Sequence, residues 1–357
     1  MRFSLVFFLS VACGAPASNA VSIQPLATAS ASAAPVTTPR PPAMTVVVTS
    51  APYGTIALWR PHNDGRIEPI AFPWAKLSNI DTLHVSPDGR EVAYVEGGSS
   101  FGPLVIRDLS KGDKTVIEPF VKGKELQVVA WSPNGRKLLY ATRSSSEVPN
   151  CIRGIHGCMQ TGPKSHRVYD RDDAKTSPVD LTLGDTEEIA ALLDSGEIVF
   201  SNDDGALERF DPISKKTTPI GGGPYRHSGF SIDGHRLLSA GWNDATKRNE
   251  VLALDLSTWR ETAIAPPAPY ATYLWPAASR SGKHVAWLAS SYAAHVHSVF
   301  LVVDNKPLVG PSADLVGFEW IDDAAIVAHY RNRLDVVDLV DGSVAGSTAT
   351  NADDMMR

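Results

Sequence analysis

The chain has 357 residues, of which 43% are hydrophobic and 20% charged, and its formal net charge is −6. This apolar content is ample for a packed core and excludes a disordered protein, while the acidic balance argues against nucleic acid as a partner. No apolar run is long enough to span a bilayer as a helix of the mature chain.

The first residues are typical of an export signal. Arg2 supplies a short positive region, Leu5 to Ala12 form a short apolar region, and small residues follow. The apolar region is too short for an anchor helix, so we expect it to be removed after export.

The segment from Leu9 to Gly14 resembles the lipobox of bacterial lipoproteins, although Ser10 stands where that family usually has leucine. The resemblance implies that residues 1–12 are the signal peptide and that Cys13 is lipidated as the mature N-terminus. It also implies a location in the bacterial cell envelope, facing the periplasm. The alternative is ordinary cleavage after Ala20, which would give a secreted protein.

The composition divides the rest of the chain into three parts. Residues 13–43 are rich in Ala, Ser, Thr and Pro and carry almost no charge, which predicts a flexible tether. Residues 44–347 have recurrent short apolar segments separated by Gly and Pro, which predicts an all-β domain without amphipathic helices. Residues 348–357 are predicted to be a disordered tail.

Two segments of this domain repeat one pattern, Val85 to Tyr94 and Trp131 to Tyr140. In each, an apolar segment enters Ser-Pro-Asp/Asn-Gly and a second apolar segment leaves it, as in a β-hairpin closed by a type I turn with a glycine bulge. The outgoing segments are apolar at both parities, which predicts a sheet covered on both faces. Weaker copies of the hairpin occur at Leu193 to Phe200, Phe230 to Leu238, Ala278 to Trp287 and Glu319 to Val327.

A second pattern, an apolar strand, a polar turn and a shorter strand, follows the hairpins. It occurs at Thr55 to Ile70, Leu104 to Ile117, Ala206 to Ile220, Glu250 to Ile264, His297 to Gly310 and Arg333 to Gly346. Together the two hairpins make a four-stranded unit that recurs about every 40 to 48 residues, which is the period of β-propeller blades. We favour seven blades, with six as the alternative, because the first unit shows only three strand candidates.

The Ser-Pro-Asp-Gly-Arg segments look like the WD40-like repeats of TolB-type propellers, which also occur in relatives of prolyl oligopeptidase. The resemblance covers Met44 to Ala345 and is strongest at Ser86 to Tyr94 and Ser132 to Tyr140. It implies a fold and no activity, because propellers have many functions. The chain has no counterpart of the α/β domain of TolB, so the role of TolB is not implied.

Sequence motifs do not identify a reaction. The sequence lacks a Gly-x-Ser-x-Gly elbow, a Walker loop, a His-Glu-x-x-His motif and a dinucleotide Gly-x-Gly-x-x-Gly. We predict no cofactor and no metal site, and we read His295 and His297 as ordinary polar residues of a strand. The balance leans away from an enzyme.

The longest interruption of the repeat is the insert Ser144 to Ser165, which contains Cys151 and Cys158. Export would place these cysteines in an oxidising compartment, so we expect a disulfide between them. Two free thiols are the alternative, and a metal site lacks a convincing set of ligands.

Strand direction separates two faces of a propeller. The Ser-Pro-Asp-Gly turns and the outer turns lie on one face, here called the regular face. The insert and the links between blades lie on the other, the irregular face, where binding residues are expected. The candidate binding residues are Trp74, Arg153, His156, Tyr225, Arg226, His227, Trp242, Tyr270, Tyr273 and Tyr292.

These observations lead to two functional hypotheses. The first is a lipid-anchored, monomeric envelope propeller that binds a protein or a polymer through its irregular face. The second is a hydrolase or lyase of the propeller type that acts on a peptide or a saccharide.

Overall fold

The computed structural model describes residues 45–50, 56–70, 83–97, 101–147, 159–183, 188–221, 223–264, 272–293 and 296–350. The chain divides into two units, Met1–Pro41 and Pro42–Arg357, and all described residues belong to the second. The regular structure of these residues is entirely β, as predicted. Within them, no helix is long and apolar enough to cross a membrane.

The described strands form one three-stranded and six four-stranded antiparallel sheets. Sheet by sheet, the strands are β1 (Val47–Ser50), β2 (Ile56–Pro61), β3 (Ile67–Ile70); β4 (Leu83–Val85), β5 (Glu91–Val95), β6 (Leu104–Asp108), β7 (Lys114–Glu118); β8 (Lys124–Trp131), β9 (Lys137–Glu147), β10 (Met159–Asp170), β11 (Lys175–Val179); β12 (Glu188–Leu192), β13 (Ile198–Ser201), β14 (Leu207–Asp211), β15 (Lys216–Pro219); β16 (Tyr225–Ile232), β17 (Arg236–Asn243), β18 (Arg248–Asp255), β19 (Glu261–Ala263); β20 (Thr272–Ala278), β21 (Val285–Ala293), β22 (Val296–Val303), β23 (Lys306–Ser312); β24 (Leu315–Trp320), β25 (Ala325–Tyr330), β26 (Arg333–Asp338) and β27 (Val344–Ala349).

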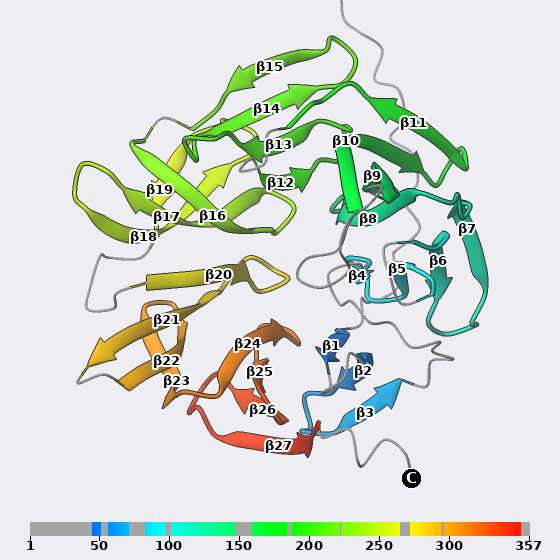
Figure 1. Cartoon of the computed structure of the whole chain (residues 1–357). Coiled ribbons are helices and arrows are strands. Elements are labelled where there is room, and N and C mark those ends of the chain that lie inside the picture. Colours follow the sequence, from blue (N-terminus) through cyan, green and yellow to red (C-terminus); the bar gives the residue numbers. More distant parts are fainter. Residues whose placement is uncertain are drawn as a thin grey trace, which may run out of the picture. The chain divides into compact units, whose positions relative to one another are not determined.

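The sheets are the blades of a β-propeller, and each is called below by its first strand. In every four-stranded sheet the strands follow in sequence order. The first strands β4, β8, β12, β16 and β20 contact one another in succession, so they are the innermost strands of the ring (Figure 1). Six complete blades match our alternative count. The favoured count of seven four-stranded blades is not found, because β1–β3 is a three-stranded sheet in the described residues.

The Ser-Pro-Asp-Gly turns have the geometry that their sequence predicts. Gly89 and Gly135 have φ of 70° and 69°, a conformation that costs glycine little. The hydroxyl of Ser86 donates to Asp88 at 2.6 Å and accepts the backbone N–H of Glu91 at 3.0 Å. Ser132 repeats both contacts in the next blade and is fully buried. The repeated serine therefore closes a hairpin and has a structural role.

Backbone hydrogen bonds place the two kinds of turn on one face, as predicted. The N–H of Leu109, in the outer turn, donates to the carbonyl of Arg90, in the Ser-Pro-Asp-Gly turn of the same blade, at 2.7 Å. Leu256 donates to His235 in the same way. The loops between second and third strands, which begin at Asn202 and Asp244, consequently lie on the opposite, irregular face.

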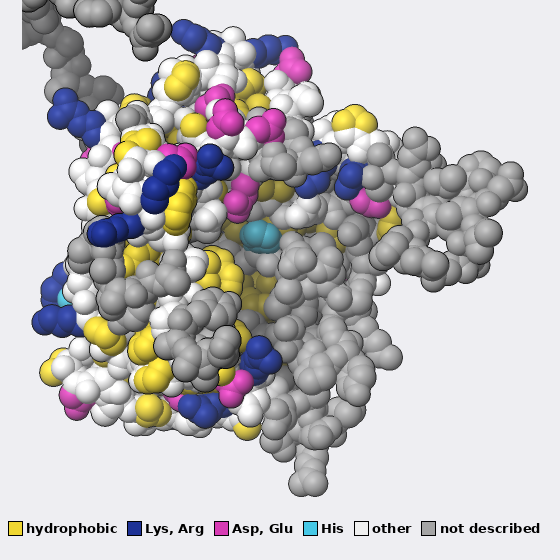
Figure 2. Space-filling view, turned by 60° about the vertical axis from the view of Figure 1, so that its left-hand side comes forward, with side chains coloured by type: hydrophobic (Ala, Val, Ile, Leu, Met, Phe, Trp, Pro, Cys, Tyr) yellow, Lys and Arg dark blue, Asp and Glu magenta, His cyan; other side chains and the backbone are white. Residues whose placement is uncertain are grey.

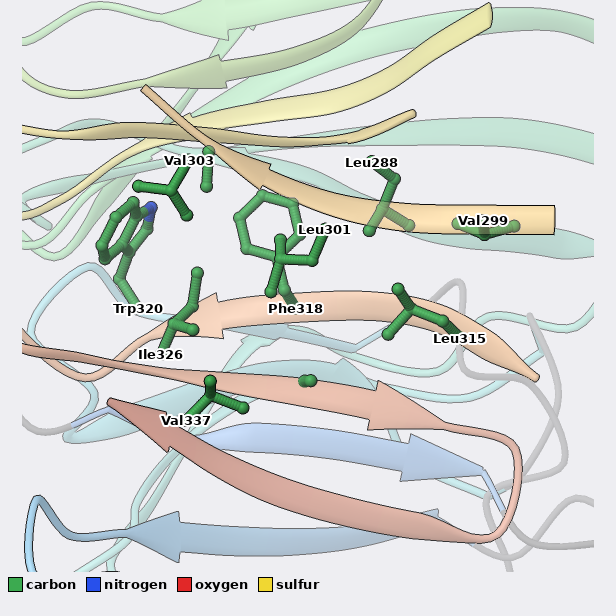
Figure 3. Close-up of a cluster of buried hydrophobic side chains, with 11 residues drawn as sticks. Leu288, Val299, Leu301, Val303, Leu315, Phe318, Trp320, Ile326 and Val337 are labelled. Carbon is green, nitrogen blue, oxygen red and sulfur yellow. The ribbon is translucent and has the colours of Figure 1, made fainter. Parts of the chain in front are cut away.

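Apolar side chains fill the spaces between neighbouring blades. Figure 3 shows Leu288, Val299 and Leu301 of the β20 blade facing Phe318 and Ile326 of the β24 blade. Such a sheet is covered on both faces, which is why its central strands are apolar at both parities.

The three-stranded sheet lies between the first and last complete blades. Leu58 of β2 packs against the β4 blade, while Ala57 and Trp59 pack on its other side against the β24 blade. The hydroxyl of Thr45 donates to the carbonyl of Trp320 at 2.7 Å. The ring is therefore closed by packing between sheets from the two ends of the domain, and β2–β3 is the outer hairpin predicted at Thr55 to Ile70.

Candidate functional site

The β16 blade brings predicted binding residues together on the irregular face. Arg226 of β16 and Trp242 of β17 are direct partners in the antiparallel register, so their side chains leave the same side of the sheet. Arg226 is exposed, and Trp242 retains 37% of its surface. Two of the predicted residues are therefore neighbours at the end of the blade.

Asp244, in the loop after β17, holds these two side chains. Its carboxylate accepts a hydrogen bond from Arg226 Nε at 3.0 Å and another from the indole Nε1 of Trp242 at 3.2 Å. Lys247 Nζ lies 3.5 Å from the same carboxylate. Arg226 and the other hydrogen-bond donors keep the pKa of Asp244 below its usual value. The result is an exposed cation beside an exposed indole, both fixed by one carboxylate.

On the other side of the same sheet lies a buried polar cluster, made by Tyr225, His227, Ser239, Glu250 and Glu261. His227 Nδ1 lies 2.9 Å from the Ser239 hydroxyl, and the Tyr225 hydroxyl donates to Glu250 at 3.1 Å. His227 Nε2 is 3.3 Å from Glu261 Oε1, and the two side chains are only 4% and 5% exposed. The cluster thus supports the strand that carries Arg226.

The protonation of this cluster follows from its burial. Burial raises the pKa of Glu261 to about 7, the nearby Glu250 carboxylate adds to the rise, and the Gly223 backbone opposes it. Burial lowers the pKa of His227 to about 4. Although His227 is close, neither oxygen of Glu261 has a partner in hydrogen-bond geometry among the described residues. Between these pKa values we assign a neutral imidazole and a protonated carboxyl.

Two of the predicted binding residues are not surface residues. Tyr273 is 3% exposed and packs edge to face on Trp287, with the ring centres 6.3 Å apart. His227 is buried in the polar cluster. The sequence predicts both at the surface because they follow loops, but each points between blades, so neither can contribute a contact surface. Tyr225 is half-buried, and the backbone of Tyr292 lies in β21.

The other predicted sites lie outside the described residues. They are four of the binding candidates, Trp74, Arg153, His156 and Tyr270; the predicted disulfide cysteines, Cys151 and Cys158; and the predicted lipidation site, Cys13.

The sequence motifs do not mark the middle of the innermost strands, where the structure has an exposed tryptophan. In β8, β12, β16, β20 and β24 the register with the second strand shifts at an irregular step. In β20 the shift falls at Trp275, which is 53% exposed. An alignment of the blade repeats places Trp275 at the position of Gly229 in β16. A tryptophan where another blade has glycine is the sequence signal that could have identified this residue.

On the side of the molecule formed by β16–β23, positively and negatively charged side chains lie among one another. Figure 2 shows lysines and arginines interspersed with carboxylates rather than gathered in one patch. In the part of the chain that the structure describes, no three His, Cys, Asp or Glu side chains are grouped so that they could hold a metal ion. The exposed aromatic residues are therefore the more distinctive features of this side.

Comparison with solved structures identifies the architecture. The chain superimposes on oligogalacturonate lyase from Vibrio parahaemolyticus with a TM-score of 0.54 and 9% identity, covering 80% of this chain and 88% of the lyase. It superimposes on a prolyl endopeptidase with a TM-score of 0.53 and 17% identity, covering 86% of this chain and 49% of that one. The chain is a β-propeller.

TolB from Acinetobacter baumannii also matches, with a TM-score of 0.47 and 17% identity over 73% of this chain. The match spans 61% of the length of TolB and about half of the endopeptidase. No protein-family model and no curated protein matches the sequence. At these identities the likeness is one of fold alone.

Proposed function

We propose that this propeller is a cell-envelope binding module that contacts a protein or a polymer through its irregular face. The observation that carries the proposal is the exposed pair of Arg226 and Trp242, fixed by Asp244. Arginine and tryptophan are the side chains that most often dominate the energy of an interface. A pair held in place before binding loses less side-chain entropy when a partner arrives.

The proposal is tested by recovery of partners from envelope extract. The double variant Arg226→Ala with Trp242→Ala is expected to lose most of the bound partner, roughly tenfold or more, since each hot-spot side chain contributes about 2 kcal/mol. Ile213→Ala is the matched control, because Ile213 is 91% exposed but lies in an outer turn of the regular face. Equal recovery with the double variant and the control would reject this surface as the contact site.

A propeller-type hydrolase or lyase acting on a peptide or saccharide is the second candidate. The buried pair of His227 and Glu261 favours it, because oppositely shifted pKa values are a feature of acid and base groups in active sites. A substrate screen with wild type and His227→Gln decides the question. Turnover that disappears in the variant would support an enzyme, and the absence of turnover would leave binding as the function.

Lipid anchoring through Cys13 is part of the proposal and has its own test. Wild type is expected to fractionate with membranes and to gain the mass of a lipid after cleavage, because the Leu9 to Gly14 segment resembles a lipobox. Cys13→Ser is expected to move to the soluble fraction. If mass and fractionation are unchanged in Cys13→Ser, the chain is cleaved elsewhere or is not lipidated.

A further inference from the structure

One tryptophan on an innermost strand is held in a backbone conformation that its side chain disfavours. Trp275 has φ of 47°, and the other described non-glycine residues with positive φ all lie in the turns between strands. In β16, the corresponding irregular step is occupied by Gly229, with φ of 61°. Glycine adopts this conformation without steric cost, whereas tryptophan does not.

The β16 strand supports this conformation. A Cβ at Gly229 would lie 3.4 Å from both the backbone N and the ring Cδ1 of Trp275, so β16 passes within van der Waals reach of this residue. The hydroxyl of Ser231 donates to the carbonyl of Pro276 at 2.5 Å and ties the next residue to β16. Strain of this kind persists where surrounding contacts enforce it, and it is most common at functional sites.

The positive φ of Trp275 does not bury its side chain in the hydrophobic core. Trp275 remains 53% exposed, whereas the tryptophans at the ends of innermost strands, Trp131 and Trp320, are 7% and 9% exposed. Those two donate their indole N–H to backbone carbonyls of the preceding blade, His84 and Ala277. About half of this positioned indole therefore stays available for contact on the inner edge of the blade.

The charges of the innermost strands indicate which ligand the indole can take. The basic residues Lys124 and Arg226 are each paired with a carboxylate, Glu118 and Asp244. Glu188 and Glu319, on β12 and β24, are solvent-accessible and form no ion pair within the described residues. The charge that remains without a counterion on these strands is thus negative.

A cationic ligand suits both the exposed indole and the unpaired carboxylates. The face of an indole is the strongest aromatic partner for ammonium and guanidinium groups. The unpaired carboxylates, Glu319 on the neighbouring strand β24 and Glu188 two blades away on β12, favour the same charge and disfavour an anionic polymer. Arginine and lysine side chains are long enough to reach an inner strand while their own backbone stays outside.

We propose that Trp275 is the anchor of a binding site for an arginine- or lysine-bearing peptide segment of a protein partner, which inserts its cationic side chain against the indole. This inference rests on the proposed binding function and specifies the class of partner. Enclosure by the surrounding strands raises the pKa of the accessible Glu319 to about 7, and burial raises that of Glu188. Binding should consequently strengthen as the pH rises through about 7, where Glu319 ionises.

Isothermal titration with deca-arginine and deca-lysine tests the site, with deca-glutamate and a neutral cello-oligosaccharide as comparison ligands. Trp275→Gly is the informative variant, since glycine relieves the positive φ. Its Tm should equal or exceed that of wild type, while its affinity for deca-arginine should fall about 3- to 30-fold, the range of a desolvated cation–π contact. Trp275→Phe should lose less affinity than Trp275→Gly.

Each alternative result decides against the site. Equal affinity of wild type and Trp275→Gly for deca-arginine would mean that the peptide binds through the net negative charge alone. Preference for the oligosaccharide would assign the indole to a sugar. If Trp275→Gly still recovers the envelope partner while the Arg226 and Trp242 double variant does not, the propeller is a binding module and the Trp275 site is wrong.

Discussion

Replacing Gly346 with alanine is expected to lower the free energy of unfolding by about 3 kcal/mol, near the upper end for a single substitution. Gly346 lies in β27 and faces Gly65, in the turn between β2 and β3. A Cβ at Gly346 would overlap the carbonyl group and Cα of Gly65. These are backbone atoms, which cannot rotate away, so β27 and the β2–β3 hairpin would have to separate where the first and last sheets meet. Thermal and urea unfolding of the purified protein measure the loss.

The matched control separates steric overlap from backbone strain. Gly112 has φ of 75°, and a Cβ added there would meet nothing within 4 Å, so Gly112→Ala carries only the cost of a left-handed alanine, about 1 kcal/mol. Gly346 has no positive φ, so Gly346→Ala carries only the overlap. Equal destabilisation by the two substitutions would contradict the proposed closure. A larger loss for Gly346→Ala would support it.

The features that the sequence predicted correctly are those that depend on residues close together along the chain. Ser132, Pro133, Asn134 and Gly135 are consecutive, and their turn forms as their conformational preferences require. The outer hairpins and the separation of the two faces follow from strand order and were also predicted. The repeated serine closes each of these hairpins, which is why the repeat identifies the fold.

The sequence could not predict contacts that depend on register and twist across several strands. His227 and Glu261 are 34 positions apart on different strands of one blade, and only the register and curvature of that blade bring them within 3.3 Å. Gly65 and Gly346 meet because the ring closes on itself. The burial of Tyr273 escaped prediction for the same reason, because one step of register decides whether its ring points outward or toward Trp287.

Glu261→Gln is expected to increase stability by about 1 kcal/mol at pH 5 and by about 3 kcal/mol at pH 8. Glutamine resembles the protonated carboxyl in shape and remains neutral. Since the pKa of Glu261 rises from 4.5 to about 7 on folding, the native state holds this proton through that range and the unfolded chain releases it. The contribution of Glu261 is therefore fully present below pH 4.5 and is lost as the pH rises through about 7.

His227 acts in the opposite direction. Its pKa falls from 6.5 to about 4 on folding, so the unfolded chain binds the extra proton between these values and stability from this residue increases with pH. The two slopes cancel between about pH 4.5 and 6.5, and wild type should show a nearly flat contribution from the pair there. His227→Gln should leave the slope of Glu261, with stability decreasing as pH rises.

Asp180→Asn is the control for removing a carboxylate, because Asp180 is 72% exposed and pairs with Lys215 on the surface. Exposed pairs of this kind contribute at most about 1 kcal/mol, and this one should show no transition near pH 7. The decisive comparison is the sign of the Glu261→Gln effect at pH 8. If His227 and Glu261 were instead a charged pair, removing one partner would leave a buried imidazolium and destabilise the protein by about 3 kcal/mol or more. A stabilising substitution at pH 8 supports a neutral imidazole and a raised pKa of Glu261, because glutamine then removes a buried carboxylate that has no cationic partner.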